Sequence, residues 1–156
     1  MRRKDREVLD PAKIQEIIGQ CSCCRIGFCD DGEVYILPLC FGYEIKDGAY
    51  VFYFHSASEG RKSGLIDKCP KVGFELDAGF ELIGAGSACG FTARYQSVIG
   101  TGLVEKVNDP DEREHGLALI MEHYTGRKEW DFDERASGST LIFKLTVNEL
   151  SCKEHK

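Results

Sequence analysis

This sequence lacks a hydrophobic segment of the length that crosses a membrane. Hydrophobic residues make up 42% of its 156 residues, but no run of them approaches the roughly 20 residues of a membrane-spanning helix. The first ten residues, MRRKDREVLD, are largely charged and lack the apolar stretch of a signal peptide. The sequence therefore predicts a soluble, cytoplasmic protein with no membrane partner.

The chain also lacks an excess of positive charge. It carries 20 Lys and Arg against 26 Asp and Glu, which gives a formal net charge of −6 and a pI near 5.3. Proteins that bind nucleic acids neutralise phosphates with a basic surface, and this composition does not supply one. We therefore expect no nucleic-acid partner.

Internal repeats, low-complexity segments and linkers are missing as well. No glycine-rich stretch resembles the fingerprint of a dinucleotide-binding fold, so a nicotinamide cofactor would bind only transiently. A chain of 156 residues is long enough to bury one hydrophobic core. We expect a single domain over residues 1–156.

Cysteine, by contrast, is frequent, with eight residues in the chain. Because nothing directs secretion, we expect these cysteines to be mostly reduced. The cluster Cys21-Ser-Cys23-Cys24, followed by Cys29 and Cys40, raises the alternative of a zinc or iron–sulfur site. Such sites usually show a second matched pair of ligands, which is not evident here. We therefore predict ordinary thiols and no metal.

The rest of the chain is organised around the stretch from Tyr50 to Ile66. Its first half is aromatic and β-branched, which is typical of a buried strand that ends near His55. Ser56 and Glu59 have the spacing of a capping box, which predicts that a helix follows directly and runs to about Lys68.

Two cations, Arg61 and Lys62, fall in the first turn of this predicted helix. Cations are ordinarily disfavoured there, because the helix dipole is already positive at its N-terminus. Two cations beside free helix N–H groups favour an anion, most naturally a phosphate. The alternative is a solvated basic pair on a surface helix.

Upstream of this stretch, Asp10 and Pro11 predict the start of a helix that ends near Gly19. Strands are expected over 24–29, 34–45 and 50–54. The dipeptides Asp31-Gly32 and Asp47-Gly48 between them are typical of hairpin turns. We therefore expect a three-stranded antiparallel meander. Pro38 lies within its second strand and cannot donate to a ladder, so it predicts a bulge or a free edge.

Downstream, strands are expected over 72–76, 94–107 and 140–150, and most of 77–93 is expected to be loop. Gly100 and Gly102 suggest a bend or bulge in the long strand. Asp109-Pro110 begins the clearest helix, which ends before Gly126. This order of elements predicts a mainly β protein with helices (α+β), namely a small antiparallel β-barrel with helical covers.

Several segments, in this order and spacing, resemble one known family. The segments are the opening MRRKDRE, PLCFGY from Pro38 to Tyr43, FYFHSASEGRK from Phe52 to Lys62, RYQSVIGTG from Arg94 to Gly102, and HYTG from His123 to Gly126. Together they resemble the FMN-binding split barrels related to pyridoxamine 5'-phosphate oxidase, and among these most closely the 5-nitroimidazole resistance (Nim) proteins. The likeness runs over nearly the whole chain.

The resemblance implies an antiparallel split β-barrel that forms a homodimer, with FMN at the subunit interfaces. It assigns the FMN phosphate to Arg61 and Lys62, and the phosphate and ribityl region also to His55 and Ser56. The isoalloxazine ring would lie against the strand that carries Leu37, Pro38, Leu39 and Cys40. Tyr95, Gln96, Ser97 and Val98 would approach the ring from a neighbouring strand or across the dimer.

The activity implied by the resemblance is an FMN-dependent reductase of small aromatic or nitro compounds, with NAD(P)H or another donor as the source of electrons. His55 is the candidate catalytic residue, and its alternative role is to cap the junction of strand and helix. Two other functions stay open, a non-catalytic flavin- or haem-binding module and a pyridoxamine-phosphate oxidase. The C-terminus, LSCKEHK, does not supply the Arg- and Trp-bearing tail of the oxidases.

Overall fold

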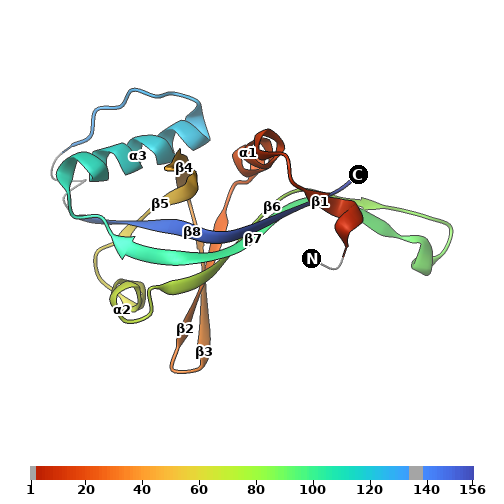
Figure 1. The fold of residues 1–156 in the computed structure, drawn as a ribbon, viewed down its shortest axis with the longest axis horizontal. Helices are drawn as coiled ribbons and strands as arrows, with labels where there is room; N and C mark the ends of the chain where they lie inside the picture. Colours follow the sequence, from red (N-terminus) through yellow and green to blue (C-terminus); the bar gives the residue numbers. More distant parts are fainter. Residues whose placement is uncertain (1–2, 134–138) are drawn as a thin grey trace.

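The structure is a computed structural model that describes residues 3–133 and 139–156. Within these residues, eight strands form one antiparallel sheet that three α-helices flank (Figure 1). The strands are β1 (Glu7–Val8), β2 (Cys24–Asp30), β3 (Glu33–Leu39), β4 (Phe41–Lys46), β5 (Ala49–Ala57), β6 (Lys71–Ile83), β7 (Thr92–Lys106) and β8 (Thr140–His155). The helices are α1 (Pro11–Gln20), α2 (Arg61–Lys68) and α3 (Pro110–Thr125), with short 3-10 turns at Lys4–Arg6 and Ala88–Gly90. The α+β class is confirmed, and none of the described helices is long and apolar enough to span a membrane.

The sheet is open within one chain. Its strand order is β3-β2-β6-β7-β8-β5-β4, with β1 paired to β8, so that β3 and β4 are the two edges. The predicted three-stranded meander is therefore wrong. The hairpins β2–β3 and β4–β5 both form, and their turns place Asp31 and Asp47 at φ 51°, each followed by a glycine at positive φ. The two hairpins, however, lie at opposite ends of the sheet.

The predicted strand over 34–45 is in fact two strands, separated at Cys40. One half pairs with β2 and the other with β5, so the chain passes from one edge of the sheet to the other at this point. Pro38 lies on β3, which has β2 on one side and no strand on the other among the described residues. The expectation of a free edge at Pro38 is confirmed.

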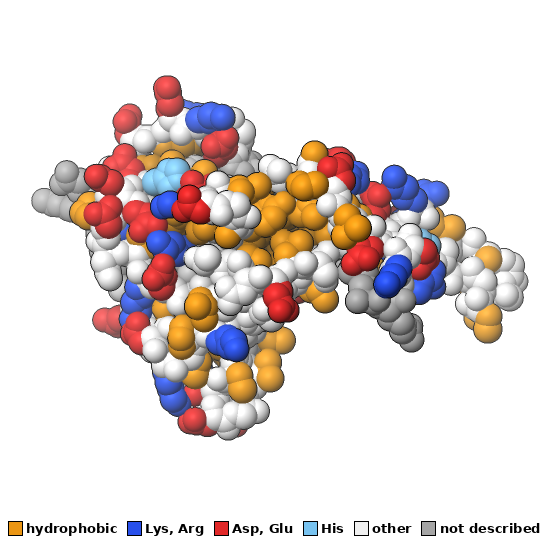
Figure 2. Space-filling view, in the orientation of Figure 1, with side chains coloured by type: hydrophobic (Ala, Val, Ile, Leu, Met, Phe, Trp, Pro, Cys, Tyr) orange, Lys and Arg blue, Asp and Glu red, His pale blue; other side chains and the backbone are white. Residues whose placement is uncertain are grey.

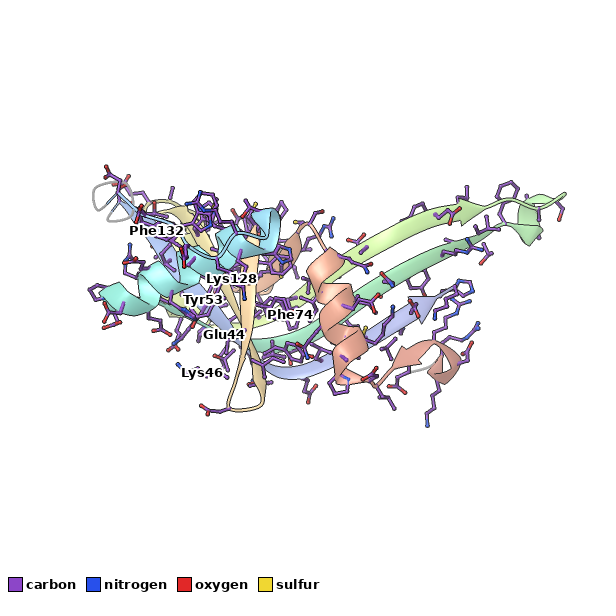
Figure 3. All side chains as sticks on the ribbon, turned by 90° about the horizontal axis from the view of Figure 1, so that it is seen from above. Glu44, Lys46, Tyr53, Phe74, Lys128 and Phe132 are labelled. Atoms are coloured by element: carbon purple, nitrogen blue, oxygen red, sulfur yellow. The ribbon has the colours of Figure 1, made fainter. Side chains whose placement is uncertain are left out.

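The strands β6 and β7 form a long hairpin that projects away from the helices (Figures 1 and 3). Most of the segment 77–93, expected as loop, belongs to this hairpin: β6 continues to Ile83 and β7 begins at Thr92. The register shifts between Ala78 and Glu81, and irregularities of this kind obscure the alternating pattern of a strand. The bend expected at the two glycines of β7 is present as a shift against β8 between Thr101 and Gly102.

Two hydrophobic clusters lie on opposite faces of β5. Phe52 and Phe54 point into the larger cluster, to which α1 contributes Ile17 and Ile18 and α2 contributes Leu65 and Ile66. Val51, Tyr53 and Ile142 point the other way, into a smaller cluster with Ile120 of α3. Helices α2 and α3 therefore cover opposite faces of this strand. Figure 2 shows further hydrophobic side chains gathered over the strands of the sheet next to α1.

Glycines allow α3 to approach the sheet closely. A Cβ atom added at Gly42 of β4 would lie 2.3 Å from the backbone of Leu119, and one at Gly116 of α3 would lie 2.7 Å from the ring of Tyr53. Real Cβ atoms essentially never come this close to non-bonded atoms, so neither position has room for a side chain. The position of α3 is thus fixed by close approach to the backbone of β4 at Gly42 and to the Tyr53 side chain of β5 at Gly116.

Candidate functional site

Helix α2 begins differently from the sequence prediction and from the other two helices. Strand β5 continues through Ser56 to Ala57, and the helix starts at Arg61 with Gly60 as its N-cap. The predicted capping box is therefore wrong, because Ser56 is still paired with β8 and its hydroxyl donates to the carbonyl of Ala57. Gly60 adopts φ 118° and ψ 174°, a conformation essentially restricted to glycine. No side chain caps the first amides of α2.

Arg61 projects from this helix start onto the β2–β3 hairpin. Its guanidinium carbon lies 4.6 Å from the centre of the Tyr35 ring, a cation–π contact. One guanidinium nitrogen lies 3.4 Å from Asp30 Oδ2 and 3.7 Å from a carboxylate oxygen of Glu33. The Arg61 side chain is still 48% exposed, so it is positioned but not enclosed.

The same hairpin also anchors the other end of α2. Lys68 contacts Asp30 at 2.8 Å and Asp31 at 2.9 Å. The hydrogen bond from Lys68, and more weakly that from Arg61, lowers the pKa of the Asp30 carboxyl from its ordinary value. Asp30 therefore stays ionised at neutral pH and holds both ends of α2 against the hairpin.

The side chain of Lys62, in contrast, makes no ion pair or hydrogen bond in the part of the chain that the structure describes. Lys62 follows Arg61 in the first helical turn, where α2 offers uncapped N–H groups. The Lys62 ammonium has no side-chain partner, the Arg61 guanidinium is still partly exposed, and the first amides of α2 have no side-chain cap. Together these groups favour an anion such as a phosphate. The assignment of a phosphate to Arg61 and Lys62 stays a prediction.

His55 and Ser56 lie on opposite faces of β5. His55 pairs with Ile142, and Ser56 pairs with Leu141. Because successive residues of a strand point to opposite faces, Ser56 lies on the face that α2 covers, whereas His55 lies on the face of Ile142 and α3. Ser56 is buried and His55 is exposed.

The residues predicted beside a planar ring lie on and just after the edge strand β3. Leu37 and Leu39 point toward the main core, while Pro38 and Cys40 are exposed. These residues pair with the start of β2, so Leu39 lies opposite Cys24. The unpaired side of an edge strand carries backbone groups that a bound ligand could use.

Tyr95, Gln96, Ser97 and Val98 lie on β7, and within one chain they are far from the edge strand. One row of paired residues runs across the sheet from Leu39 through Cys24 and Leu76 to Val98. At the usual strand spacing, Leu39 and Val98 are about 14 Å apart along the sheet. The expectation that β7 neighbours β3 is wrong, since β2 and β6 lie between them.

The start of β7 belongs instead to a cluster with both ends of the chain. Arg6 donates to the Tyr95 hydroxyl at 3.3 Å and lies 3.2 Å from His155 Nε2. The other ring nitrogen of His155, Nδ1, lies 2.5 Å from the carbonyl of Ala93. A carbonyl only accepts, so Nδ1 carries the proton and Nε2 accepts from Arg6. Gln96 donates to Glu154 at 2.8 Å in the same cluster.

A separate polar network joins α3 to the sheet. Tyr53 is almost fully buried, and its hydroxyl lies 3.0 Å from Glu44 and 3.3 Å from Glu112 (Figure 3). Lys144 contacts Glu112 at 2.6 Å, and His115 contacts Glu44 at 3.0 Å. Burial, followed by the neighbouring carboxylates, raises the pKa of Tyr53 far above its ordinary value. These hydrogen bonds and the Lys144–Glu112 ion pair attach α3 to β4, β5 and β8.

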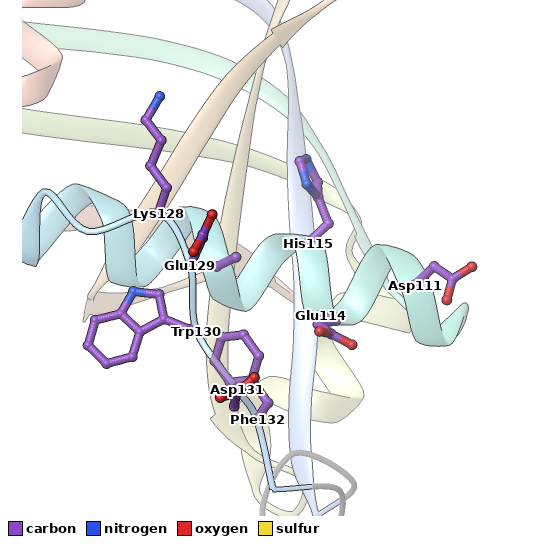
Figure 4. A pocket seen from close by; sticks show the side chains of 9 residues that line it. Asp111, Glu114, His115, Lys128, Glu129, Trp130, Asp131 and Phe132 are labelled. Carbon is purple, nitrogen blue, oxygen red and sulfur yellow. The ribbon is translucent and has the colours of Figure 1, made fainter.

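A hollow of about 450 Å³ lies beside this network, between α3 and the segment that follows it (Figure 4). It is lined by four carboxylates, Asp111, Glu114, Glu129 and Asp131, with His115, Ala118, Lys128, Trp130 and Phe132. Such a lining repels phosphate, and it includes none of the predicted site residues. No group of three or more His, Cys, Asp or Glu residues suited to a metal occurs among the described residues.

Sequence reasoning missed Gly60 and the acceptors of Arg61. Gly60 could have been found from its place just before the basic pair, since glycine is acceptable as an N-cap. The contacts of Arg61 with Tyr35 and Asp30 join residues more than 25 positions apart and had no local signal.

Comparison with known proteins links this geometry to a family. The family model described as pyridoxamine 5'-phosphate oxidase matches residues 10–154. The solved structure of a candidate 5-nitroimidazole antibiotic resistance protein from Bacteroides thetaiotaomicron is 30% identical, with a TM-score of 0.80, over 95% of this chain and 86% of the other. A search of curated proteins finds no match.

Two more distant structures share the fold. The flavocytochrome Anf3 from Azotobacter vinelandii has a TM-score of 0.80 at 19% identity, over 100% of this chain and 72% of its own. An FAD- and haem-binding protein from Mycobacterium smegmatis has a TM-score of 0.80 at 15% identity, over 97% of this chain and 74% of its own. At these identities the likeness establishes the split-barrel fold alone.

Proposed function

This chain belongs to the pyridoxamine 5'-phosphate oxidase family, and on that premise we propose that it binds FMN and acts as an FMN-dependent reductase of small aromatic or nitro compounds. The observation that carries the proposal is the start of α2. Gly60 leaves the first amides of the helix without a side-chain cap, and Lys62 beside them has no partner among the described residues. A phosphate monoester fits this combination of charge and free donors.

Each residue of the helix start has a different part in holding the phosphate. Lys62 supplies a mobile point charge, whereas Arg61 supplies a fixed donor whose direction is set by the Tyr35 ring and by Asp30. The buried hydroxyl of Ser56 lies on the same face of β5 as α2, whereas His55 lies on the other face. The phosphate clamp is therefore Arg61, Lys62 and the first amides of α2.

The edge strand β3 is the proposed support of the isoalloxazine ring. Leu37 and Leu39 give it an apolar inner side, and Pro38 withholds one backbone donor from the ladder. The unpaired edge can present its remaining N–H and C=O groups to a planar heterocycle. Bound FMN would supply the redox chemistry, with NAD(P)H as a transient donor of electrons. The protein would bind, orient and exclude water.

We propose a homodimer as the functional state, because the exposed hydrophobic residues lie where a second copy could cover them. The outer face of β3 exposes Val34 (71%) and Ile36 (61%), and β7 exposes Ile99 (49%). Gly27 and Gly73 pair with each other between these strands and line a shallow hollow together with Val34 and Ile36. An apolar face of this kind is typical of an interface.

Dimerisation would also explain how the predicted site residues of β3 and of β7 could contact the same flavin ring. Tyr95 to Val98 lie too far across the sheet from β3 to meet a ring bound there in the same chain. The projecting β6–β7 hairpin carries the exposed Phe80 and Leu82, and β7 starts at Thr92, three residues before Tyr95. Contact with a second copy could therefore bring the start of β7 to the partner's edge strand.

The decisive experiment is a titration of the apoprotein with FMN and with riboflavin, followed by spectroscopy of the complex. We expect binding of about one FMN per chain and clearly weaker binding of riboflavin, which lacks the phosphate. Bleaching of the flavin band by NADH, and its return on addition of a nitroaromatic compound, would support a reductase. If FMN binds but NADH does not reduce it, the protein would be a flavin-binding protein without this reductase activity. No FMN binding at all would falsify the proposal.

A further inference from the structure

Cys23 and Cys40 are the residues that directly flank the open end of the β2–β3 ladder. Cys24 and Leu39 are the last paired residues of this ladder. If the antiparallel register continues by one residue, Cys23 lies opposite Cys40. Opposite residues of an antiparallel pair point to the same face, with Cα atoms about 4.5–5.5 Å apart. That separation is within the range of about 4.4–6.8 Å that a disulfide requires.

Tyr124 of α3 independently holds the two segments together beyond the ladder. Its hydroxyl donates to the carbonyl of Ser22 at 2.9 Å and accepts from the amide of Phe41 at 3.2 Å. Ser22 immediately precedes Cys23, and Phe41 immediately follows Cys40. Burial raises the pKa of Tyr124 to about 12, and the nearby Cys40 and Cys23 thiols add to this effect. The phenol is thus neutral, and its hydroxyl joins the residue before Cys23 to the residue after Cys40.

The other cysteines differ in access or in partners. Cys21, Cys24 and Cys152 are buried, and burial raises the pKa of each thiol, to about 11 for Cys152. Cys29 is exposed but lies opposite Val34 in the ladder. Cys69, partly exposed, is the C-cap of α2, and the exposed Cys89 lies in the 3-10 turn Ala88–Gly90, so neither lies opposite a cysteine in a ladder. Cys40 is exposed and Cys23 is partly exposed, and the structure holds both as free thiols. Solvent access and a facing partner therefore coincide at Cys23 and Cys40.

We propose that Cys23 and Cys40 form a reversible disulfide when the protein meets a small oxidised disulfide such as glutathione disulfide. The thiolate of the more exposed Cys40 attacks one sulfur of the oxidant and releases one glutathione thiolate. The Cys23 thiolate then attacks the Cys40 sulfur of this mixed disulfide and releases the second glutathione. The two cysteines lose two electrons, the oxidant is reduced to two thiols, and the two cysteine protons end on those thiols. This step does not depend on flavin.

The disulfide would fix the end of the edge strand. Cys40 is also the point where the chain leaves β3 for β4 at the other edge of the sheet. A covalent link from Cys40 to Cys23 would hold this crossing to the start of β2. The dithiol is therefore a modification site at which the thiol redox state would decide whether the crossing from β3 to β4 is covalently linked to the start of β2.

The test uses the full-length protein, reduced, desalted and incubated with glutathione disulfide before the remaining thiols are alkylated. Peptide mass spectrometry without reduction should find a Cys23–Cys40 cross-link, lighter by two hydrogens than the two separate peptides and reversed by dithiothreitol. Cys23→Ser and Cys40→Ser should each abolish it, and Cys29→Ser, a change on the same hairpin, should retain it. A stable glutathione adduct on Cys40 with Cys23 alkylated would overturn the proposal. So would a cross-link of Cys40 to any other cysteine.

Tyr124→Phe tests the positioning by the phenol. This variant keeps the ring and removes both hydrogen bonds to Ser22 and Phe41. We expect the cross-link to form about threefold to tenfold more slowly, with the same product. An unchanged rate would show that Tyr124 does not position the two thiols.

Discussion

The three α-helices that the structure describes begin in two different ways. At the starts of α1 and α3, an aspartate N-cap accepts a hydrogen bond from a helix amide and a proline follows it. At the start of α2, a glycine takes the N-cap position, no side chain caps the amides, and Arg61 and Lys62 follow. At the capped starts, an aspartate of the chain itself accepts a hydrogen bond from a free helix amide. At the start of α2, the free amides and the positive charge stay available for a bound ligand.

The difference also extends to what the helices cover. Helix α3 closes its face of β5 with a hydrogen-bonded network of Tyr53, Glu112 and Lys144. Helix α2 is tied down by Asp30 through Lys68 and part of Arg61, while Lys62 has no partner among the residues described. The region of α3 is therefore suited to stability and the start of α2 to an anionic ligand.

The largest expected effect is the loss of phosphate recognition when both cations of α2 are removed. In Arg61→Ala/Lys62→Ala, FMN affinity should fall at least about tenfold, because charge-assisted contacts contribute roughly 1.5–3 kcal/mol each. Riboflavin affinity should be unchanged. Isothermal titration with both ligands measures this difference.

The matched control for this variant is Lys68→Ala, which removes one cation from the other end of α2. Lys68 contacts Asp30 and Asp31 and should not contact the phosphate. Its FMN affinity should stay near that of the parent. If riboflavin binding of the double variant fell as far as FMN binding, the basic pair would have a structural role. The start of α2 would then not be a phosphate site, in spite of its difference from the capped starts of α1 and α3.

The next effect concerns the backbone at Gly60. A Cβ atom there would meet nothing within 4 Å, so Gly60→Ala is strained by its positive φ alone. We expect the free energy of unfolding of the apoprotein to fall by about 1–3 kcal/mol, with weaker FMN binding. Denaturant unfolding measures the first and titration the second.

Gly64→Ala is the control for Gly60, since Gly64 lies inside α2 with open space around it and no positive φ. Alanine is preferred to glycine there, and this variant should gain up to about 1 kcal/mol. Equal losses in the two glycine variants would mean that α2 is sensitive to any change and that its start is not special.

The sequence predicted the capped helices well, because their signals are local. Asp10-Pro11 and Asp109-Pro110 each mark a helix start within two adjacent residues, and Gly126 marks the end of α3 at φ 70°. The dipeptide Asp-Gly identified both hairpins for the same reason.

The features that the sequence did not predict depend on pairing between strands that are far apart in the chain. Ser56 and Glu59 have capping-box spacing, but hydrogen bonding to β8 keeps the chain extended through Ala57. The separation of β3 from β4 depends on the pairing of β2 with β6 and of β5 with β8. At the candidate site, Arg61 and Lys62 could be found from the dipole argument, whereas the Tyr35 and Asp30 contacts depend on the tertiary fold.

A smaller effect is expected at the capped starts. Asp109 accepts from the amide of Glu112 at 2.9 Å, and Asp10 accepts from that of Ala12 at 3.1 Å. Asp109→Ala and Asp10→Ala should each lower the free energy of unfolding by about 1 kcal/mol without changing the ratio of FMN to riboflavin affinity. A changed ratio in either variant, measured with protein that is fully folded, would show that ligand selectivity is not confined to α2.

The smallest effect on binding is expected at His55, which lies six residues before Arg61 but on the other face of β5. Its partner Ile142 belongs to the cluster under α3, whereas the phosphate clamp lies on the side of α2. His55→Ala should therefore leave FMN affinity within about threefold, a change below about 0.7 kcal/mol. If His55 donates a proton during turnover, nitro-compound reduction by the FMN-saturated variant should be slower than that of the parent. Titration and steady-state assays at saturating FMN separate the two roles. A variant that loses FMN, yet turns over at the parental rate once saturated, would make His55 a binding residue and would extend the ligand site to the α3 face of the strand.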